Sequence, residues 1–279
     1  MKLIADSGST KTDWVLCDKE GKPKKNIPTL GLNPFYRDSE EIAKILGNEL
    51  TPHLRGFKVK EVYFYGSGCS TKEKCKIVEK GILDVLPGVE VQVEHDLLGA
   101  ARALCQREAG IVCILGTGSN SCVYDGEKIV ENIPSLGYLI GDEGSGTHLA
   151  KELIKAYYYN ELPENLKIFF EKKINVSKDE FLKILYNESN PNVYMASFAK
   201  YLKEEGEDPF VQDLVQSCLI EFIDRHVMKY QSVDHLPVHF TGSIAYYYSD
   251  ELEFTLNNTG LIRGKIIQKP VEGLVEYHH

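Results

Sequence analysis

The sequence predicts a duplicated α/β fold, in which a sheet that begins with a β-hairpin and continues in strand–helix units occurs twice. Two observations support this prediction. The apolar run "KLIA" leads into the turn "DSGST" at residues 6–10, and the apolar run "GIVCI" leads into "LGTGSN" at residues 115–120. Each turn is followed by a second strand-like run and then by further strand and helix patterns. The length of 279 residues suits one large or two medium domains.

The first half of the chain is predicted to fold as strand, tight turn and strand, then loop, helix, strand, helix, strand and helix. Asp38, with Glu41 three residues later, forms a capping-box pattern at the start of the first helix. Pro87 and Gly88 end the second helix. We assign these elements in turn to residues 2–17, 28–38, 39–50, 59–68, 72–86, 89–96 and 97–108.

The same pattern restarts at residue 110. Residues 110–132 predict a strand, the hydroxyl-rich turn and a second strand, with Asp125-Gly126 as a hairpin turn into another strand. The segment 134–158 is a loop that runs into a helix, and residues 178–230 are mostly helical because strand alternation is absent. "LPVHFTGSIAYYY" predicts a buried strand, a Gly/Ser turn and a helix start. No flexible linker divides the halves, so we place the boundary near residues 104–110.

Composition excludes several classes of function. The chain has 32 basic and 41 acidic residues, a net charge of −9 and no Lys/Arg-rich block, which disfavours nucleic-acid binding. No apolar stretch approaches the roughly 20 residues of a membrane span, and we expect no signal peptide. Seven cysteines without CxxC spacing argue against a disulfide framework or a zinc site and favour a cytoplasmic setting. We place no function on the terminal "EYHH".

The two turns have the chemistry of a phosphate site. Turns of Gly, Ser and Thr between strands expose several backbone N–H groups in one direction, and such a nest binds phosphate oxygens. One such turn alone is more often a plain hairpin, but the pair, with "TGS" at residues 241–243, favours phosphate binding. A carboxylate such as Asp6 beside a phosphate requires a cation, which indicates Mg²⁺. Neither a P-loop signature nor GxGxxG after a strand occurs.

Three polar residues allow two interpretations each. Asp96 follows a predicted strand at its carboxyl end, where open α/β sheets place ligands, so it is either the base of a phosphoryl transfer or the N-cap of a helix that begins at Leu97. Asn33 is either a sugar contact or a turn residue. Asp142 is either a sugar contact or, with Glu143, a cap of the next helix.

"DSGSTKTDW", "LGTGSNS" and "HFTGSIA" resemble the phosphate-1 hairpin, phosphate-2 hairpin and adenosine loop of the sugar kinase/heat-shock ATPase/actin superfamily. "LGTGSNS" followed by "GYLIGDEGSG" resembles its N-acetylglucosamine kinase branch, which includes the activator ATPases of benzoyl-CoA reductases and hydroxyacyl-CoA dehydratases. The resemblance implies a two-lobed, actin-like (ribonuclease H-like) fold with five-stranded mixed sheets around a cleft. Residues 1–105 would form the N-terminal lobe and 106–269 the C-terminal lobe. The segment 270–279 would join the first lobe, although it is shorter and more charged than the closing helix of this family.

The resemblance also implies a role for each matching residue. ATP and Mg²⁺ would be the cofactors, with Asp6 organising the metal and Asp96 acting as the catalytic base. The implied cofactor-binding residues are Asp6, Gly8, Ser9, Thr10, Lys11, Gly116, Thr117, Gly118, Ser119, Gly242 and Ser243. The implied substrate-binding residues are Asn33, Ser67, Gly68, Asp96, Thr117, Gly137 and Asp142.

The function expected from these residues is an ATP-dependent kinase that phosphorylates a hydroxyl of an amino sugar, with N-acetylglucosamine as the first choice. Two alternatives stay open: an activator ATPase with an iron–sulfur cluster between subunits, and a non-catalytic sugar or nucleotide sensor. No cysteine lies in the Gly-rich loop that a cluster needs, and the presence of Asp6 and Asp96 argues against a sensor. The expected partner is a small sugar, with no nucleic acid and no membrane, and a homodimer is left open.

Overall fold

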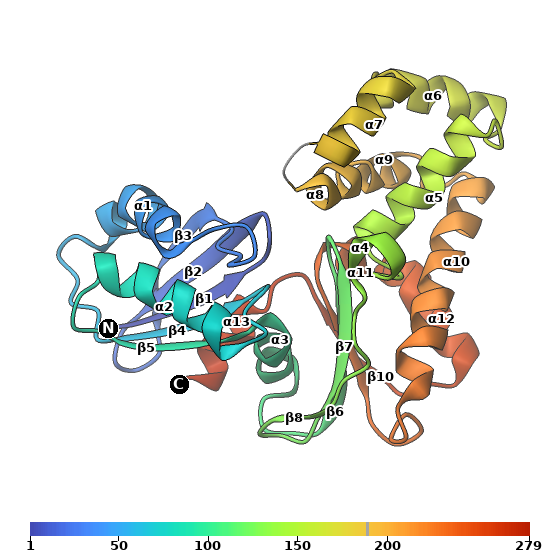
Figure 1. Ribbon diagram of the computed structural model, residues 1–279. Coiled ribbons are helices and arrows are strands. Elements are labelled where there is room, and N and C mark those ends of the chain that lie inside the picture. The colour runs from blue at the N-terminus through green and yellow to red at the C-terminus, as the bar shows by residue number, and fades with distance from the viewer. Residues whose placement is uncertain (188–189) are drawn as a thin grey trace. The chain divides into compact units, whose positions relative to one another are not determined.

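The computed structural model describes residues 1–187 and 190–279 and divides into two compact units. Unit 1 comprises Met1–Gly110, Tyr124–Val130 and Lys269–His279, and unit 2 comprises Ile111–Val123 and Glu131–Gln268. The described chain forms two five-stranded sheets (Figure 1). The strand order is β3-β2-β1-β4-β5 in the first sheet, and β8-β7-β6-β9-β10 repeats it in the second. The predicted duplicated α/β fold with two mixed sheets is therefore confirmed.

The sheet of unit 1 begins with the hairpin that the sequence predicts. β1 pairs antiparallel with β2 and parallel with β4, and β5 continues the parallel part. The strands are β1 (Lys2–Ser7), β2 (Lys11–Cys17), β3 (Pro23–Leu30), β4 (Glu61–Gly66) and β5 (Glu90–His95). The helices are α1 (Ser39–Glu49), α2 (Lys72–Val85), α3 (Asp96–Cys105) and α13 (Val271–Tyr277), and η1 (Thr51–Leu54) is a 3-10 turn.

β3 is a difference from the sequence prediction, which assigns no strand to residues 23–30 and begins a loop at residue 28. Two prolines and two lysines lie within it, at Pro23, Lys24, Lys25 and Pro28. Proline cannot donate to a central ladder, but β3 is an edge strand of its sheet, with β2 as its neighbour. The edge position explains both why the strand forms and why its composition does not predict it.

Both faces of this sheet are covered by helices. Leu3 and Ala5 of β1 and Trp14 of β2 are buried in one apolar core with Ile42 of α1 and Ile82 of α2. Because side chains alternate along a strand, the residues between them point to the opposite face, where α13 packs against β1, β2 and α3. The predicted capping box of α1 is present, with the Asp38 side chain accepting from the backbone N–H of Glu41.

The chain's last residues take part in this packing. The His278 ring stacks on Tyr63 with ring centroids 3.8 Å apart, and its Nε2 lies 2.7 Å from the hydroxyl of Tyr65. Lys2 donates to the carbonyl oxygen of His278. Although α13 is short, it is thus tied to β1 and β4 by specific contacts.

Unit 2 combines its sheet with most of the helices. The second sheet is formed by β6 (Gly110–Leu115), β7 (Ser119–Tyr124), β8 (Ile129–Glu131), β9 (Val238–Thr241) and β10 (Arg263–Ile267), of which Gly110, Tyr124, Ile129 and Val130 are grouped with unit 1. The helices of unit 2 are α4 (Gly137–Ile140), α5 (Gly146–Tyr158), α6 (Glu164–Ile174), α7 (Lys178–Asn187), α8 (Pro191–Ala196), α9 (Ala199–Glu204), α10 (Pro209–Arg225), α11 (Ser243–Tyr247) and α12 (Ser249–Thr259), with the 3-10 turn η2 (Val227–Lys229). The mostly helical stretch predicted for residues 178–230 is confirmed, except at 188–189, which lie outside the described residues.

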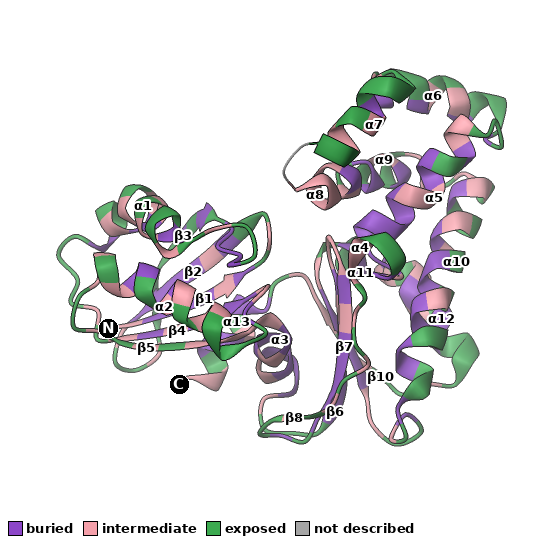
Figure 2. Cartoon of the chain, in the orientation of Figure 1, coloured by how far each residue is buried: buried purple, intermediate pink, exposed green. Residues whose placement is uncertain are grey.

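One apolar core joins this sheet to its helices. Ile111 and Cys113 of β6 are buried with Leu153 of α5, Phe222 of α10 and Leu252 of α12. Figure 2 shows the buried residues along the inner sides of α5 and α10. Within the described ranges, no helix has the length and the apolar character needed to cross a membrane.

Candidate functional site

The first predicted phosphate turn is the bend between β1 and β2. The backbone N–H of Gly8 donates to the carbonyl oxygen of Lys11 at 2.9 Å, which closes the bend. The N–H of Gly31 donates to the carbonyl oxygen of Thr10 at 3.0 Å. A Cβ on Gly31 would lie 2.5 Å from the carbonyl oxygen of Ser9, so only glycine allows this approach. The structure therefore joins the "DSGST" turn to the loop that carries Asn33.

Asn33 lies between the turn and the end of β4. Its Nδ2 is 3.4 Å from Ser9 Oγ and 3.5 Å from Ser67 Oγ, and the residue is only 7% exposed. A Cβ on Gly68 would lie 2.2 Å from Asn33 Oδ1. Asn33 Oδ1 also accepts from the N–H of Phe35, so the residue does make the local turn considered as its alternative role. The structure brings Ser9, Asn33, Ser67 and Gly68 together, while the sugar contact stays a prediction.

Asp6 lies in an excess of negative charge. It is the second-to-last residue of β1 and pairs with Asp13 of β2, and burial, followed by the carboxylates of Asp96 and Asp13, raises the pKa of Asp6 to about 7. Lys11 and Lys269 act in the opposite direction on that pKa. Their ammonium groups lie 3.0 Å and 3.3 Å from the carboxylate of Asp13.

This charge distribution fits a magnesium ion. Mg²⁺ prefers oxygen ligands and is usually held by one or two carboxylates, waters and the phosphates of a substrate. Such a site needs no larger cluster, and no group of three or more His, Cys, Asp or Glu within residues 1–187 and 190–279 could hold a metal.

Sequence reasoning missed Asp13 and Lys269. The two-residue spacing of Lys11 and Asp13, which places both on one face of a strand, is the signal that could have found Asp13.

Asp96 is the first residue of α3. The N-cap is His95, so the interpretation of Asp96 as the N-cap of a helix that begins at Leu97 is wrong. The N–H of Leu97 donates to Asp96 Oδ1 at 2.8 Å and also to His95 Nδ1 at 3.1 Å. A carboxylate is favoured at this helix end by the backbone dipoles. The Asp96 side chain keeps 23% of its surface exposed, so a substrate can reach it.

The second predicted phosphate turn, between β6 and β7, is fixed to the start of α5. Gly116 closes it by donating its N–H to the carbonyl oxygen of Gly118 at 2.9 Å. The N–H groups of Gly146 and Thr147 donate to the carbonyl oxygens of Gly116 and Thr117 at 2.8 Å and 3.1 Å. Ser119 Oγ is buried without a hydrogen-bond partner in the part of the chain that is described. This turn therefore has a fixed backbone and an unused hydroxyl.

The "TGS" turn lies against the same bend. Gly242 has φ 110° and ψ 167°, a conformation that essentially only glycine adopts. A Cβ there would lie 2.3 Å from the carbonyl oxygen of Leu115 and 3.2 Å from the N–H nitrogen of Gly116. Ser243 follows as an exposed residue at the start of α11. Unit 2 thus brings together the turns at 116–118 and 241–243.

Replacing Gly242 by alanine is expected to lower the free energy of unfolding by about 3 kcal/mol, because the new Cβ meets backbone atoms and the dihedral angles are unfavourable. Gly260→Ala is the matched control: Gly260 also has a positive φ of 72°, but a Cβ there would meet none of the described atoms within 4 Å. Urea unfolding of both variants measures the difference. Equal losses would contradict a specific contact between the two turns.

Asp142 stands beside the second turn in a strained conformation. Its φ is 57°, in the left-handed region, and the residue is buried. Oδ1 accepts from Ser135 Oγ at 2.7 Å and from the N–H of Ser119 at 3.3 Å. Burial raises the pKa of Asp142, and these two hydrogen bonds only partly offset it. Ser135, which sequence reasoning missed, also accepts from the N–H of Gly137, the first residue of α4.

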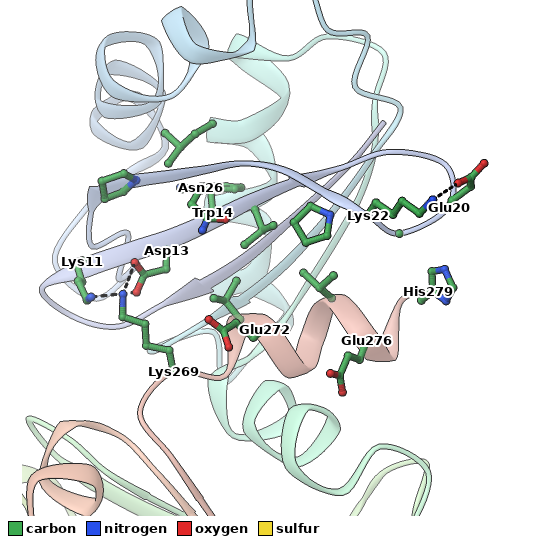
Figure 3. A pocket seen from close by; sticks show the side chains of 17 residues that line it. Lys11, Asp13, Trp14, Glu20, Lys22, Asn26, Lys269, Glu272, Glu276 and His279 are labelled. Carbon is green, nitrogen blue, oxygen red and sulfur yellow. Dashed lines mark hydrogen bonds and ion pairs between the residues drawn. The ribbon is translucent and has the colours of Figure 1, made fainter.

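Unit 1 also has a pocket of about 990 Å³ beside the first turn (Figure 3). It is lined by β2, β3 and α13. Figure 3 shows Lys11, Asp13 and Lys269 together at one end and Lys22 with Glu20 at the other. The end with Lys11, Asp13 and Lys269 lies beside β1, the strand that carries Asp6 and pairs it with Asp13. The Lys11–Asp13–Lys269 group therefore belongs to the surroundings of the predicted magnesium site.

No protein-family model matches the chain, and no curated protein matches it. Among solved structures, a candidate N-acetylglucosamine kinase from Porphyromonas gingivalis is 40% identical, with a TM-score of 0.95 over 100% of this chain and 99% of that one. A candidate N-acetylglucosamine kinase from Chromobacterium violaceum is 19% identical, with a TM-score of 0.75 over 100% and 98%. A ROK family glucokinase from Streptomyces griseus, in complex with glucose and AMPPNP, is 14% identical, with a TM-score of 0.59 over 99% and 97%. At 19% and 14% identity, the last two similarities show that these proteins share the fold of this chain.

Proposed function

Because this chain belongs to the N-acetylglucosamine kinase-like branch of the sugar kinase/heat-shock ATPase/actin superfamily, we propose that it is an ATP-dependent kinase that phosphorylates a hydroxyl of an amino sugar, first of all N-acetylglucosamine. The observation that supports this most is the pair of carboxylates in unit 1. Asp6 lies in an excess of negative charge beside a Gly/Ser/Thr turn, and the partly exposed Asp96 contributes to that charge. A kinase needs one carboxylate for its metal and another for its base.

The proposed chemistry assigns one task to each group. Asp96 orients the attacking sugar hydroxyl and accepts its proton as the new oxygen–phosphorus bond forms. The bond between the γ-phosphorus and the bridging oxygen breaks, and its electron pair leaves with ADP. Magnesium, held by Asp6 through water, neutralises charge on the phosphates when it is bound.

The remaining predicted residues would bind the two substrates. We propose that the sugar hydroxyls are held by Asn33, Ser67, Gly68, Thr117, Gly137 and Asp142. We propose that the nucleotide is held by Gly8, Ser9, Thr10, Lys11, Gly116, Thr117, Gly118, Ser119, Gly242 and Ser243. Buried amides and carboxylates suit sugar recognition because an analogue that lacks a hydroxyl leaves them unpaired.

A coupled assay of ADP release tests the proposal. The panel is glucose, glucosamine, N-acetylglucosamine, N-acetylmannosamine and N-acetylmuramic acid, each with ATP and with or without Mg²⁺. We expect the highest kcat/KM with N-acetylglucosamine and no turnover when EDTA removes the metal. A protein that leaves ATP intact with every sugar would contradict the kinase. Tight sugar binding without turnover would identify a sensor, and iron in the purified protein would identify an activator ATPase.

A further inference from the structure

The backbone conformation of the loop at residues 142–144 has to be stabilised by contacts with other parts of the chain. Asp142 has a left-handed φ of 57° and Gly144 has a φ of 69°. A non-glycine residue in that region is strained and persists only where its surroundings hold it. Ser135 and Ser119 hold the Asp142 carboxylate directly. The next two residues are each held by a histidine, one in α5 and the other at the C-terminal end of α10.

Glu143 is held by His226, the C-cap residue that directly follows α10. His226 Nε2 lies 3.0 Å from Glu143 Oε2, and the Arg225 guanidinium lies 3.8 Å from Oε1. His226 is 4% exposed, and its ring stacks on that of Phe222 with ring centroids 4.9 Å apart. Its other nitrogen, Nδ1, is buried and has no hydrogen-bond partner among the residues that the structure describes. The hydrogen bond to Glu143 is therefore the polar contact that this buried ring makes.

Gly144 is held by His148 of α5. The backbone N–H of Gly144 donates to His148 Nδ1 at 3.0 Å, so Nδ1 is the acceptor and a neutral ring carries its proton on Nε2. That Nε2 faces Glu221 at 3.6 Å and Glu152 at 3.9 Å. A Cβ on Gly144 would lie 2.8 Å from Phe222 Cβ, so the loop backbone lies directly on α10.

We propose that His148 and His226 are positioning residues for sugar binding, which hold residues 142–144 between α5 and α10 so that the Asp142 carboxylate keeps its place. The inference rests on the proposed function, because it gives Asp142 the sugar contact. Neither histidine touches the substrate in this scheme. Their effect passes through two hydrogen bonds to the residues that directly follow Asp142.

Four variants test this role through kinetics. His226→Leu and His148→Leu are expected to raise the KM for the sugar roughly tenfold, because a displacement of about 1 Å at a binding group has effects of that size or larger. The KM for ATP is expected to change less than about twofold. His226→Gln and His148→Asn place a polar atom near the lost ring nitrogen, Nε2 and Nδ1 respectively, and are expected to restore most of the sugar affinity.

His239→Leu is the matched control. His239 is also buried in unit 2, and its Nδ1 accepts a backbone N–H, that of Lys265, at 3.0 Å, far along the chain from the loop. The control variant should lose stability to a similar extent as His148→Leu but keep the KM for the sugar. An equal rise in that KM for His239→Leu and His148→Leu would overturn the proposal, since it would show a general effect of damage to unit 2.

Hydrogen exchange separates this inference from the proposed function. Faster amide exchange at residues 142–145 in His148→Leu and His226→Leu, but not in His239→Leu, supports the positioning role without any assay of activity. If the wild-type protein does not phosphorylate any sugar and this exchange pattern is found, the kinase proposal fails while the loop contacts stand. If the protein is active and Asp142→Asn raises the sugar KM, but both histidine variants keep wild-type KM and exchange, the positioning role is wrong.

Discussion

Replacement of Asp96 by asparagine is expected to lower kcat about 10³-fold while the KM values for sugar and ATP change less than about threefold. General-base catalysis contributes roughly 10² to 10⁴ in rate, and loss of a group that acts in the transition state lowers kcat more than it raises KM. Asparagine has the size of aspartate and keeps an oxygen that can accept the Leu97 N–H, so α3 should still begin at the same residue. Steady-state kinetics at saturating Mg²⁺ measure the effect.

Asp38→Asn controls for the loss of a carboxylate at a helix start. Asp38 caps α1 in the same unit and accepts from two backbone N–H groups, but it is exposed and takes no part in the proposed chemistry. This variant should keep full turnover with only a small loss of stability. If the Asp96→Asn protein retained the wild-type kcat, Asp96 would not be the catalytic base. The strongest chemical argument for a kinase would then be lost.

The predictable part of the fold comes from local signals. The Gly/Ser/Thr turns, the capping box at Asp38 and the hairpin turn at Asp125-Gly126 each depend on residues within about five positions, so the sequence alone reveals them. β3 and β10 have no such signal. β3 forms because the edge position tolerates its prolines, and β10 forms because it extends the parallel pairing with β9. Both depend on a sheet that already exists.

The same distinction applies to the candidate site. Sequence reasoning found the residues that lie in recognisable turns, and the structure joins Ser9 with Asn33 in unit 1 and Gly118 with Asp142 in unit 2. It missed Lys269, which reaches Asp13 from 256 positions away, and His226, which reaches Glu143 from 83 positions away. Residues that are so far apart along the chain form no short motif with a recognisable spacing, so the sequence alone does not reveal their contact. That both phosphate turns serve one nucleotide stays a prediction.

Replacement of Asp6 by asparagine is expected to abolish at least 99% of the turnover and yet to stabilise the ligand-free protein at alkaline pH. The activity is lost because an amide is neutral and a poor partner for Mg²⁺ and its water shell. The stability is gained because Asp6, whose pKa is raised to about 7 by burial and by the Asp96 and Asp13 carboxylates, is costly to ionise in the folded state.

The sign of the pH dependence follows from linkage. The pKa of Asp6 in the folded state lies above its unfolded value of 3.8. The stability that protonated Asp6 contributes to the folded state is therefore fully present below pH 3.8 and is lost as the pH rises through about 7. The asparagine variant has no such loss. The stability difference between variant and wild type should therefore widen by roughly 2 kcal/mol from pH 5 to pH 8, with about 3 kcal/mol as an upper bound because Asp6 keeps some contact with solvent.

Thermal and urea unfolding at pH 5 and pH 8 measure this difference, with Asp84→Asn, an exposed change on α2, as the control that should show no widening. Replacing a structural carboxylate lowers the stability of the protein. A carboxylate that is retained to bind a ligand instead destabilises the ligand-free protein, and ligand binding offsets this destabilisation. Asp6→Asn with reduced stability at pH 8 would show that Asp6 is structural. A more stable but inactive variant, for which added Mg²⁺ and ATP no longer raise Tm as they do in the wild type, would show that Asp6 is retained to bind the metal nucleotide.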